Sequence, residues 1–162
     1  EIFERAPSQS RIPVPAGASL SRYAVVKGEN TVEENVLVAQ RSYLENTFMG
    51  KGANAQENCY LIDSHLEGFD VTAHGGKVIS ADLGKRVFVG FNSFLKGKPD
   101  CRLKIGSDCV IMPHTIIDLE EPIEIPPNTL VWGFIANSED LSRIPLILTS
   151  SGKLMGNLIL VV

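Results

Sequence analysis

The stretch from Val26 to Leu44, which reads VKGENTVEENVLVAQRSYL, decides the fold. Aliphatic residues return at every sixth position, at Val26, Val32, Val38 and Leu44. An amphipathic helix repeats its apolar positions about every 3.6 residues, and a half-buried strand repeats them every second residue. A period of six fits neither, and a fixed internal repeat is the signature of a solenoid.

The same period continues along the chain in three further series. They are Met49, Ala55 and Leu61, after a slip of one residue; Leu83, Val89 and Leu95; and Ile105, Ile111, Ile117 and Ile123. A period of six suits a coil of triangular cross-section, in which each side is a short strand that points one aliphatic side chain inward. Val and Ile favour strands and fill these sides.

The corners between the sides need residues that tolerate left-handed backbone angles, chiefly Gly, Asn and Asp. Such residues recur between the aliphatic positions, in Gly28-Glu29-Asn30, Glu34-Asn35, Gly50-Lys51-Gly52, Glu57-Asn58, Gly84, Gly90 and Gly106-Ser107-Asp108. A β-sandwich is the alternative, but its strands alternate apolar and polar residues and keep no six-residue period. The sequence therefore predicts an all-β fold, a left-handed parallel β-helix of hexapeptide repeats with a short C-terminal helix or tail.

The pattern divides the chain into three segments. We expect residues 1–20, which include three prolines, to run extended, residues 21–135 to form the β-helix, and residues 136–162 to form a helix or strand tail. The period is interrupted twice. Residues 62–78 predict either another coil or a protruding loop, and residues 97–102 predict a smaller excursion.

The tail itself has two parts. Asn137 precedes acidic residues, as an N-cap does, and predicts a short helix. Beyond it, the apolar runs at 146–148 and 158–162 predict strands that form a hairpin, pack on the coil or pair with another subunit.

Composition excludes several classes of function. The 162 residues, of which 44% are hydrophobic, suit one globular domain with its own core. A net charge of −4 without a basic patch excludes nucleic acid as an expected partner, and no apolar run reaches the roughly 20 residues of a membrane span. Residues 1–5 lack the basic start of a signal peptide, so we expect a cytoplasmic protein. Cys59, Cys101 and Cys109 predict thiols and no disulfide framework.

Three motifs point to a family. Arg41 is followed fifteen residues later by Gln56, within MGKGANAQEN at 49–58; His74 precedes LGKRVFVGFNSFLKG at 83–97; and IPPNTLVWG occupies 125–133. These motifs resemble the γ-class carbonic anhydrase-like branch of the hexapeptide-repeat proteins. That branch has an Arg-Gly-Asp turn, a coil ending Asn-x-Gln-Asp-Asn, a zinc histidine, an Ile-Gly coil and the motif Gly-His-x-x-x-x-His-Gly.

The resemblance implies a trimer in which three histidines hold zinc between neighbouring subunits, and zinc-bound hydroxide attacks carbon dioxide. His74 matches the first ligand, but Phe91 and Lys96 stand at the second and third positions, and Tyr43 replaces the Asp of the turn. Gln56 matches the residue that orients the zinc-bound water. Phe cannot ligate a metal and protonated Lys repels one, so we expect tight zinc binding to be lost and no cofactor to be needed.

Two functions follow as hypotheses. The first is a non-catalytic homotrimer that acts as a binding or assembly subunit. The second is an enzyme: a hexapeptide-repeat acyltransferase, or a carbonic anhydrase whose zinc site is rebuilt because His65 or His114 reaches His74 across an interface. Acyltransferases of similar fold often use one histidine as general base, with an acyl-thioester held between subunits. The candidate catalytic residues are Arg41, Gln56 and His114, and the candidate metal ligand is His74.

The residues at the replaced ligand positions predict either an anion pocket or an inactive interface. Lys96 beside Phe91 and Phe94 predicts a pocket for a small anion between subunits, to which Arg41 and Arg86 add positive charge. The alternative is a repacked, inactive subunit interface.

Overall fold

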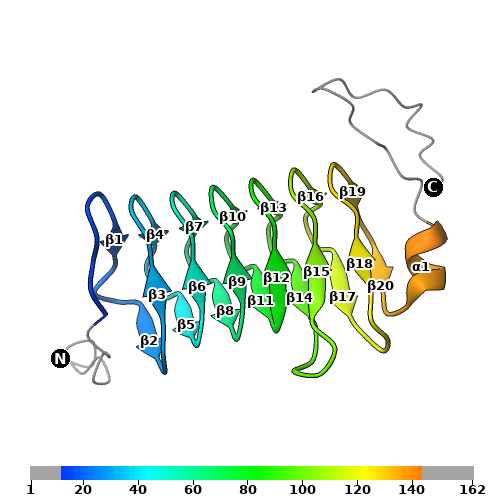
Figure 1. The fold of residues 1–162 in the computed structure, drawn as a ribbon, viewed down its shortest axis with the longest axis horizontal. Coiled ribbons are helices and arrows are strands. Elements are labelled where there is room, and N and C mark those ends of the chain that lie inside the picture. The colour runs from blue at the N-terminus through cyan, green and yellow to red at the C-terminus, as the bar shows by residue number, and fades with distance from the viewer. Residues whose placement is uncertain (1–11, 144–162) are drawn as a thin grey trace.

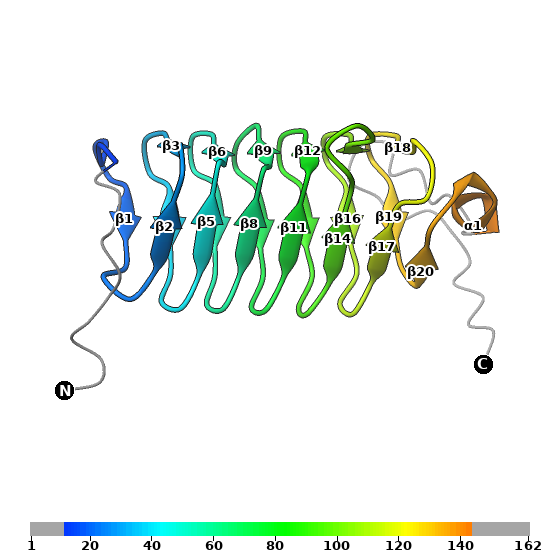
Figure 2. The ribbon, with the colours of Figure 1, turned by 90° about the horizontal axis from the view of Figure 1, so that it is seen from below.

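The chain winds into a stack of three-sided coils in the computed structural model, which describes residues 12–143 (Figure 1). Each full coil adds one strand to each of three parallel sheets, here called A, B and C. Figure 2 shows the strands of sheet B side by side from β2 to β20. The fold class predicted from the sequence, a left-handed parallel β-helix with a short C-terminal helix, is confirmed.

The strands are short, and each pairs in parallel with the strand one coil away. Sheet A contains β1 (Ser19–Leu20), β4 (Leu37–Val38), β7 (Asn54–Ala55), β10 (Val71–Thr72), β13 (Phe88–Val89), β16 (Val110–Ile111) and β19 (Leu130–Val131). Sheet B contains β2 (Val25–Lys27), β5 (Tyr43–Glu45), β8 (Tyr60–Ile62), β11 (Lys77–Ile79), β14 (Phe94–Lys96), β17 (Ile116–Asp118) and β20 (Phe134–Ile135). Sheet C contains β3 (Thr31–Val32), β6 (Phe48–Met49), β9 (His65–Leu66), β12 (Ala81–Leu83), β15 (Leu103–Ile105) and β18 (Glu124–Ile125).

The regular coil contains seventeen residues. Asn54 pairs with Val71 and Val71 with Phe88, in each case seventeen positions on. The corner between sheets B and C is one residue shorter than the other two corners, and this explains the slip between Leu44 and Met49 in the sequence. Every residue of the four aliphatic series is buried, with at most 6% of its surface exposed. The core therefore runs along the whole rod as stacked inward side chains.

Positive φ angles mark the corners. Asn35, Asn58 and Asp108 adopt them, as predicted for residues of this type. Arg41, Phe69, Arg86 and His114 also have φ angles between 56° and 62°, and all four are exposed. The left-handed conformation costs such residues about 1 kcal/mol each, which the ladders above and below must offset.

Residues 62–78 form an ordinary coil from β8 to β11, not a protruding loop. Its inward positions are Leu66, Thr72 and Val78. The polar Thr72 replaces an aliphatic residue, which is why the period was interrupted in the sequence. The Thr72 hydroxyl is buried and has no hydrogen-bond partner among the described residues.

Two coils are longer than the others. From β13 to β16 the register advances by 22 residues, because residues 97–102 leave the rod between β14 and β15, as predicted. An antiparallel bridge between Lys98 and Cys101 closes this excursion. From β16 to β19 the register advances by 20 residues, through a second lengthening at 119–123 that the sequence analysis did not predict.

The helix α1 (Ser138–Arg143) follows the last strand. Its N-cap is Asn137, as predicted, because the side-chain oxygen of Asn137 accepts a hydrogen bond from Asp140 N at 3.0 Å. Glu121, in the second lengthened corner, accepts another from Ser138 N at 2.7 Å.

Some expectations fall outside the described part of the chain. They concern residues 1–11 of the N-terminal segment and the apolar runs at 146–148 and 158–162. Within the described part, no helix has the length and apolar character that crossing a membrane requires.

Candidate active site at the edge between sheets A and B

The corners between sheets A and B line up along one edge of the rod, here called the A/B edge. Backbone hydrogen bonds join successive corners: Asn58 N to Gln40 O at 3.2 Å, Gly75 N to Glu57 O at 3.0 Å, Asn92 N to His74 O at 3.0 Å and His114 N to Phe91 O at 2.8 Å. The structure thus brings three of the predicted residues, Arg41, His74 and His114, to this edge, and Gln56 leads into it from β7. Because the coil has three sides, the A/B edge lies opposite sheet C.

His74 is paired with Glu57 from the preceding coil. Its Nδ1 atom lies 2.6 Å from Oε2 of Glu57. In the neutral ring, Nδ1 carries the proton and donates a hydrogen bond to the carboxylate, so the lone pair stays on Nε2. About half of the His74 side chain is exposed, and no described residue bonds Nε2. An oriented imidazole with an accessible Nε2 is what a general base needs.

Phe91 lies one coil beyond His74 on the same edge. The two rings stack, with their centroids 5.6 Å apart and their planes at 4°. Phe91 is 45% exposed, so it covers one face of the imidazole and leaves apolar surface beside it. His114 follows one coil later; its side chain is exposed and its φ angle is 62°. Two strand spacings of about 4.8 Å separate His74 from His114.

Gln56 and Arg41 share this edge, but no hydrogen bond joins either of them to His74 among the described residues. The Gln56 carbonyl accepts a hydrogen bond from Ser42 Oγ at 2.7 Å, whereas its side-chain Oε1 is buried without a described partner. A buried, unpaired amide oxygen costs about 1–3 kcal/mol. Arg41 lies two coils before His74 and points into solvent.

The residues at the family's zinc positions do not fit a zinc site. Phe91 offers no donor atom, and Lys96 lies at the far end of β14, where its ammonium group is 3.3 Å from Asp118. His65 is on sheet C, opposite the A/B edge. No group of three or more His, Cys, Asp and Glu side chains in the described chain could hold a metal ion. Zinc needs about three such ligands, and His74 supplies one.

The basic residues suggested for an anion pocket do not converge within one chain. Arg41 lies on the A/B edge, whereas Lys96 lies at the corner between sheets B and C. Arg86 lies at the corner between C and A, where its Nε bonds Asp108 at 2.6 Å. Tyr43, at the position of the family's aspartate, stacks on Tyr60 at 5.7 Å between ring centroids.

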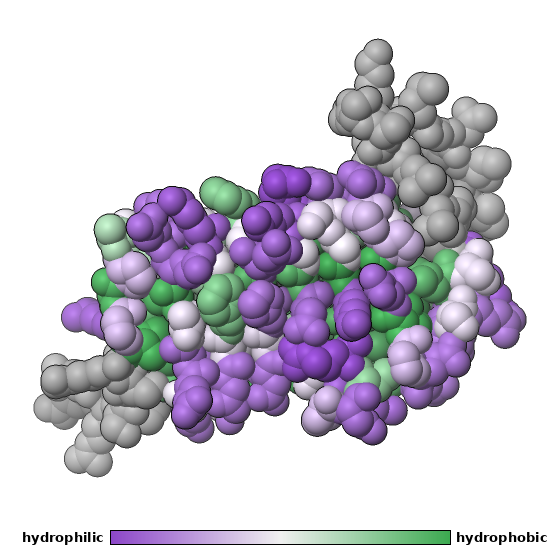
Figure 3. Space-filling view, viewed as in Figure 1, coloured by the Kyte–Doolittle hydropathy of each residue, from purple (hydrophilic) through white to green (hydrophobic). Residues whose placement is uncertain are grey.

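Exposed apolar side chains gather around the A/B edge. On sheets A and B or on the edge itself lie Tyr23, Leu37, Tyr60, Phe91, Val110, Met112, Ile116, Trp132 and Phe134. The other exposed large apolar side chains described are Val14 and Phe69, and none belongs to sheet C. Figure 3 shows one face of the rod, on which hydrophilic side chains cover most of the surface with apolar ones between them. Apolar surface of this extent around one edge is typical of an interface.

Glu57 was missed as a functional residue in the sequence. It was interpreted only as part of a corner, beside Asn58. The signal that could have found it is its spacing: Glu57 precedes His74 by seventeen residues, which is one regular coil.

Comparison with known proteins finds matches among solved structures. No protein-family model and no curated protein matches the chain. Among solved structures, the chain is similar to one described as a "putative acetyltransferase" from Desulfovibrio desulfuricans G20, with 63% identity and a TM-score of 0.78. The match covers 79% of this chain but 28% of that one, so the chain corresponds to less than a third of its neighbour.

Proposed function

We propose that this chain is the hexapeptide-repeat domain of an acyltransferase, with His74 as its general base. The observation that carries the proposal is the 2.6 Å contact between Nδ1 of His74 and Glu57, which orients the ring and leaves Nε2 outward. The similarity to an acetyltransferase-like structure supports the same reaction class.

In the proposed reaction, Nε2 of His74 removes a proton from the hydroxyl or amine of an acceptor. The acceptor then attacks the carbonyl carbon of an acyl-thioester, so that a C–O or C–N bond forms and the C–S bond breaks. The imidazolium returns its proton to the leaving thiolate. The Glu57 carboxylate stabilises the imidazolium between these steps, as a carboxylate does for other catalytic histidines.

The proposal includes a homotrimer in which the A/B edge of each subunit faces a neighbour. In one chain His74 is open to water, whereas proton transfer and thioester attack benefit from a site that excludes water. A neighbouring subunit would cover the exposed apolar residues around the edge and close the site. Arg41, Gln56 and His114 would lie in the same interface, where Arg41 is available for an anionic part of the thioester.

The second candidate is a γ-carbonic anhydrase-like binding or assembly subunit without catalysis. The residues that replace two zinc ligands favour this candidate. Phe91 stacks on His74, the one ligand histidine that remains, and Lys96 pairs with Asp118. A relocated zinc site would require His74 of one subunit to meet His65 or His114 of another.

Metal content and thioester turnover of the purified, untagged protein separate these candidates. The acyltransferase proposal expects a metal-free trimer that releases free thiol from an acetyl-thioester when an amine acceptor is added. Near-stoichiometric zinc together with carbon dioxide hydration would contradict the acyltransferase proposal and support a carbonic anhydrase with a relocated zinc site. A metal-free trimer that neither binds nor turns over the thioester would contradict both enzyme candidates and support the non-catalytic binding or assembly subunit.

A further inference from the structure

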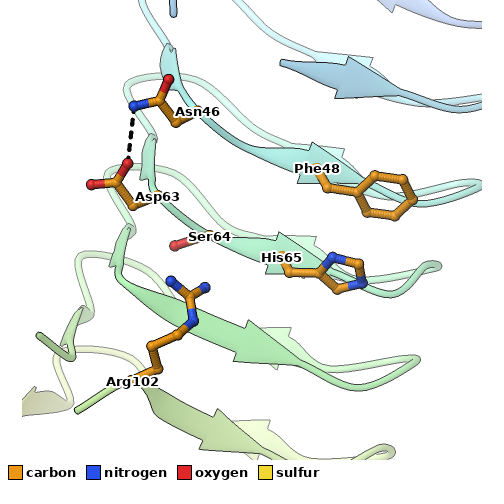
Figure 4. Close-up of a pocket in the computed structure, with 6 residues that line it drawn as sticks. All are labelled: Asn46, Phe48, Asp63, Ser64, His65 and Arg102. Atoms are coloured by element: carbon orange, nitrogen blue, oxygen red, sulfur yellow. Dashed lines mark hydrogen bonds between the residues drawn. The ribbon is translucent and has the colours of Figure 1, made fainter. Parts of the chain in front are cut away.

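A pocket lies on the outer face of sheet C, opposite the A/B edge, and has a volume of about 330 Å³ (Figure 4). It is lined by Asn46, Phe48, Asp63, Ser64, His65 and Arg102. In Figure 4, Asn46 and Asp63 lie on one side, the rings of Phe48 and His65 on another, and Arg102 between the two on the next coils. The pocket shares no residue with the Glu57–His74 pair.

Arg102 comes from the excursion at 97–102 and is held in place by Asp82. Its Nε and Nη2 atoms donate to the two carboxylate oxygens of Asp82 at 2.9 and 2.6 Å, and Nη2 also donates to Ala81 O at 3.2 Å. The hydrogen bond from Arg102 lowers the pKa of Asp82, so this carboxylate stays charged and balances the guanidinium. Nη1 donates to no described residue, and it remains available to a ligand.

Asp63 supplies the opposite charge across the pocket. Its Oδ1 accepts a hydrogen bond from Nδ2 of Asn46 at 3.0 Å, but no described cation forms an ion pair with it. The pKa of Arg102 is raised first by Asp82 and also by the charge of Asp63, although Asp63 and Arg102 form no ion pair. The carboxylate of Asp63 and the guanidinium of Arg102 therefore both line the pocket without pairing with each other.

The rings of the pocket supply a flat wall. His65 stacks on Phe48 from the preceding coil, with centroids 4.5 Å apart and planes at 8°. This stacking fixes the imidazole, and no described residue forms a hydrogen bond with its ring nitrogens. One ring nitrogen can donate to a ligand and the other can accept.

We infer that this pocket binds a small zwitterion of the amino-acid type, with its ammonium group at Asp63 and its carboxylate at Nη1 of Arg102 and at His65. A simple anion fits poorly, because Asp82 already balances Arg102 and Asp63 adds a negative charge. A simple amine would be held by Asp63 but would leave the donors of Arg102 and His65 unused. A ligand with both charges satisfies both sides, and charge-assisted hydrogen bonds are the strong ones.

The test is a titration of the 162-residue chain with glycine, L-serine, L-glutamine and β-alanine, in which NMR signals of the His65 ring report binding. Propylamine and propionate carry one charge each and serve as matched controls. At least one amino acid should bind with a Kd about tenfold or more below both controls, because each control loses one charge-assisted contact. Absence of binding by all four amino acids, or equal binding by propylamine, would overturn the inference.

Variants test the assigned contacts. Asp63→Asn removes the charge at a corner whose φ angle is 47°, and Asn tolerates that conformation well, so the variant should fold. It should weaken binding of the amino acid about tenfold or more. Glu124→Gln, on the same sheet but away from the pocket, should leave the Kd unchanged. Unchanged binding by Asp63→Asn, or equal losses in the two variants, would contradict the site.

Discussion

The proposed chemistry depends on Glu57 as well as on His74. Glu57 acts through His74, as a positioning residue. The side-chain oxygen of a glutamine at this position could still accept a hydrogen bond from Nδ1–H. It would lack the charge that stabilises the imidazolium. The pair is a charge-assisted hydrogen bond of the kind that fixes a histidine tautomer.

We therefore expect Glu57→Gln to lower kcat for thioester turnover about tenfold, with little change in KM. Steady-state kinetics measures both constants. Glu34→Gln is the matched control, because Glu34 pairs with Lys51 away from the A/B edge. A Glu57→Gln variant with wild-type kcat would show that Glu57 does not assist His74.

Asp70 is a buried carboxylate that the mechanism does not use. Its oxygens accept hydrogen bonds from Gly68 N at 2.9 Å and Val87 N at 2.8 Å, and burial raises its pKa to about 6. The folded state therefore holds a proton between about pH 4 and 6 that the unfolded state has released, so the stabilising contribution of Asp70 is lost as pH rises through this window.

This predicts a pH-dependent difference between wild type and Asp70→Asn. The free energy of unfolding of wild type, minus that of the variant, should fall by about 2 kcal/mol from pH 4 to pH 7. Urea denaturation at both pH values measures it. The subtraction removes the opposite contribution of carboxylates whose pKa is lowered, such as Asp82 and Asp108. A difference that is flat or rises with pH would contradict the burial of Asp70.

At the scale of the coil, the sequence predicted the inward positions well, because one aliphatic side chain per strand is a strict requirement of stacking. The exception is Ile123, which lies in the lengthened corner at 119–123, so that Ile125 is the inward residue of β18. It left the coil at 62–78 open because Thr72 breaks that pattern. Excursions follow no period, so the sequence could locate the excursion at 97–102 but could not predict where it places its side chains. Gly97 allows the chain to leave the rod at this point, because a β-carbon at position 97 would lie 2.3 Å from Ser80 O. That the excursion brings Arg102 onto sheet C depends on packing that no local pattern encodes.

Thr72→Val tests the inward packing directly. Val has nearly the same shape as Thr and removes a buried hydroxyl that has no described partner. We expect the variant to be more stable by about 1 kcal/mol.

The control for this prediction is Thr129→Val. The Thr129 hydroxyl donates to Pro126 O at 2.6 Å, so its loss should destabilise the protein. Chemical denaturation of both variants gives the two signs. A Thr72→Val protein that is less stable than wild type would show that the Thr72 hydroxyl is hydrogen-bonded inside the folded protein.

At the scale of the whole molecule, the distribution of exposed apolar residues predicts a trimer. Ile116 is 42% exposed on sheet B, among the residues that would face a neighbour. We expect Ile116→Glu to convert the trimer to monomers at micromolar concentration, because the interface would bury an unpaired charge. Sedimentation velocity measures the mass.

Lys104→Glu also places a glutamate on an outer strand position, but on sheet C, and it should stay trimeric. A wild-type protein that is monomeric at micromolar concentration would contradict the proposed assembly. So would an Ile116→Glu variant with the mass of wild type.

The candidate site could be predicted only in part from the sequence. The resemblance to the γ-carbonic anhydrase-like proteins selected Arg41, Gln56 and His74, and the lone histidine of a hexapeptide coil selected His114. The stacking of coils puts these residues on or beside one edge, because each is close to a multiple of a coil from the next. The pairing of His74 with Glu57 required the length of the coil, which the sequence series alone did not fix.

The most direct test of the central claim compares two single variants, His74→Gln and His114→Gln, in their rate of thiol release from an acetyl-thioester. If His74 is the general base, His74→Gln should lose about 100-fold or more in kcat, while His114→Gln stays near wild type. Both variants should keep the circular dichroism of wild type, since both side chains are exposed in the single chain and neither belongs to the core. Sedimentation velocity checks that both variants keep the trimer mass, so that a loss of activity is not a loss of assembly. Turnover by His74→Gln at the wild-type rate, or an equal loss in His114→Gln alone, would contradict the assignment of His74.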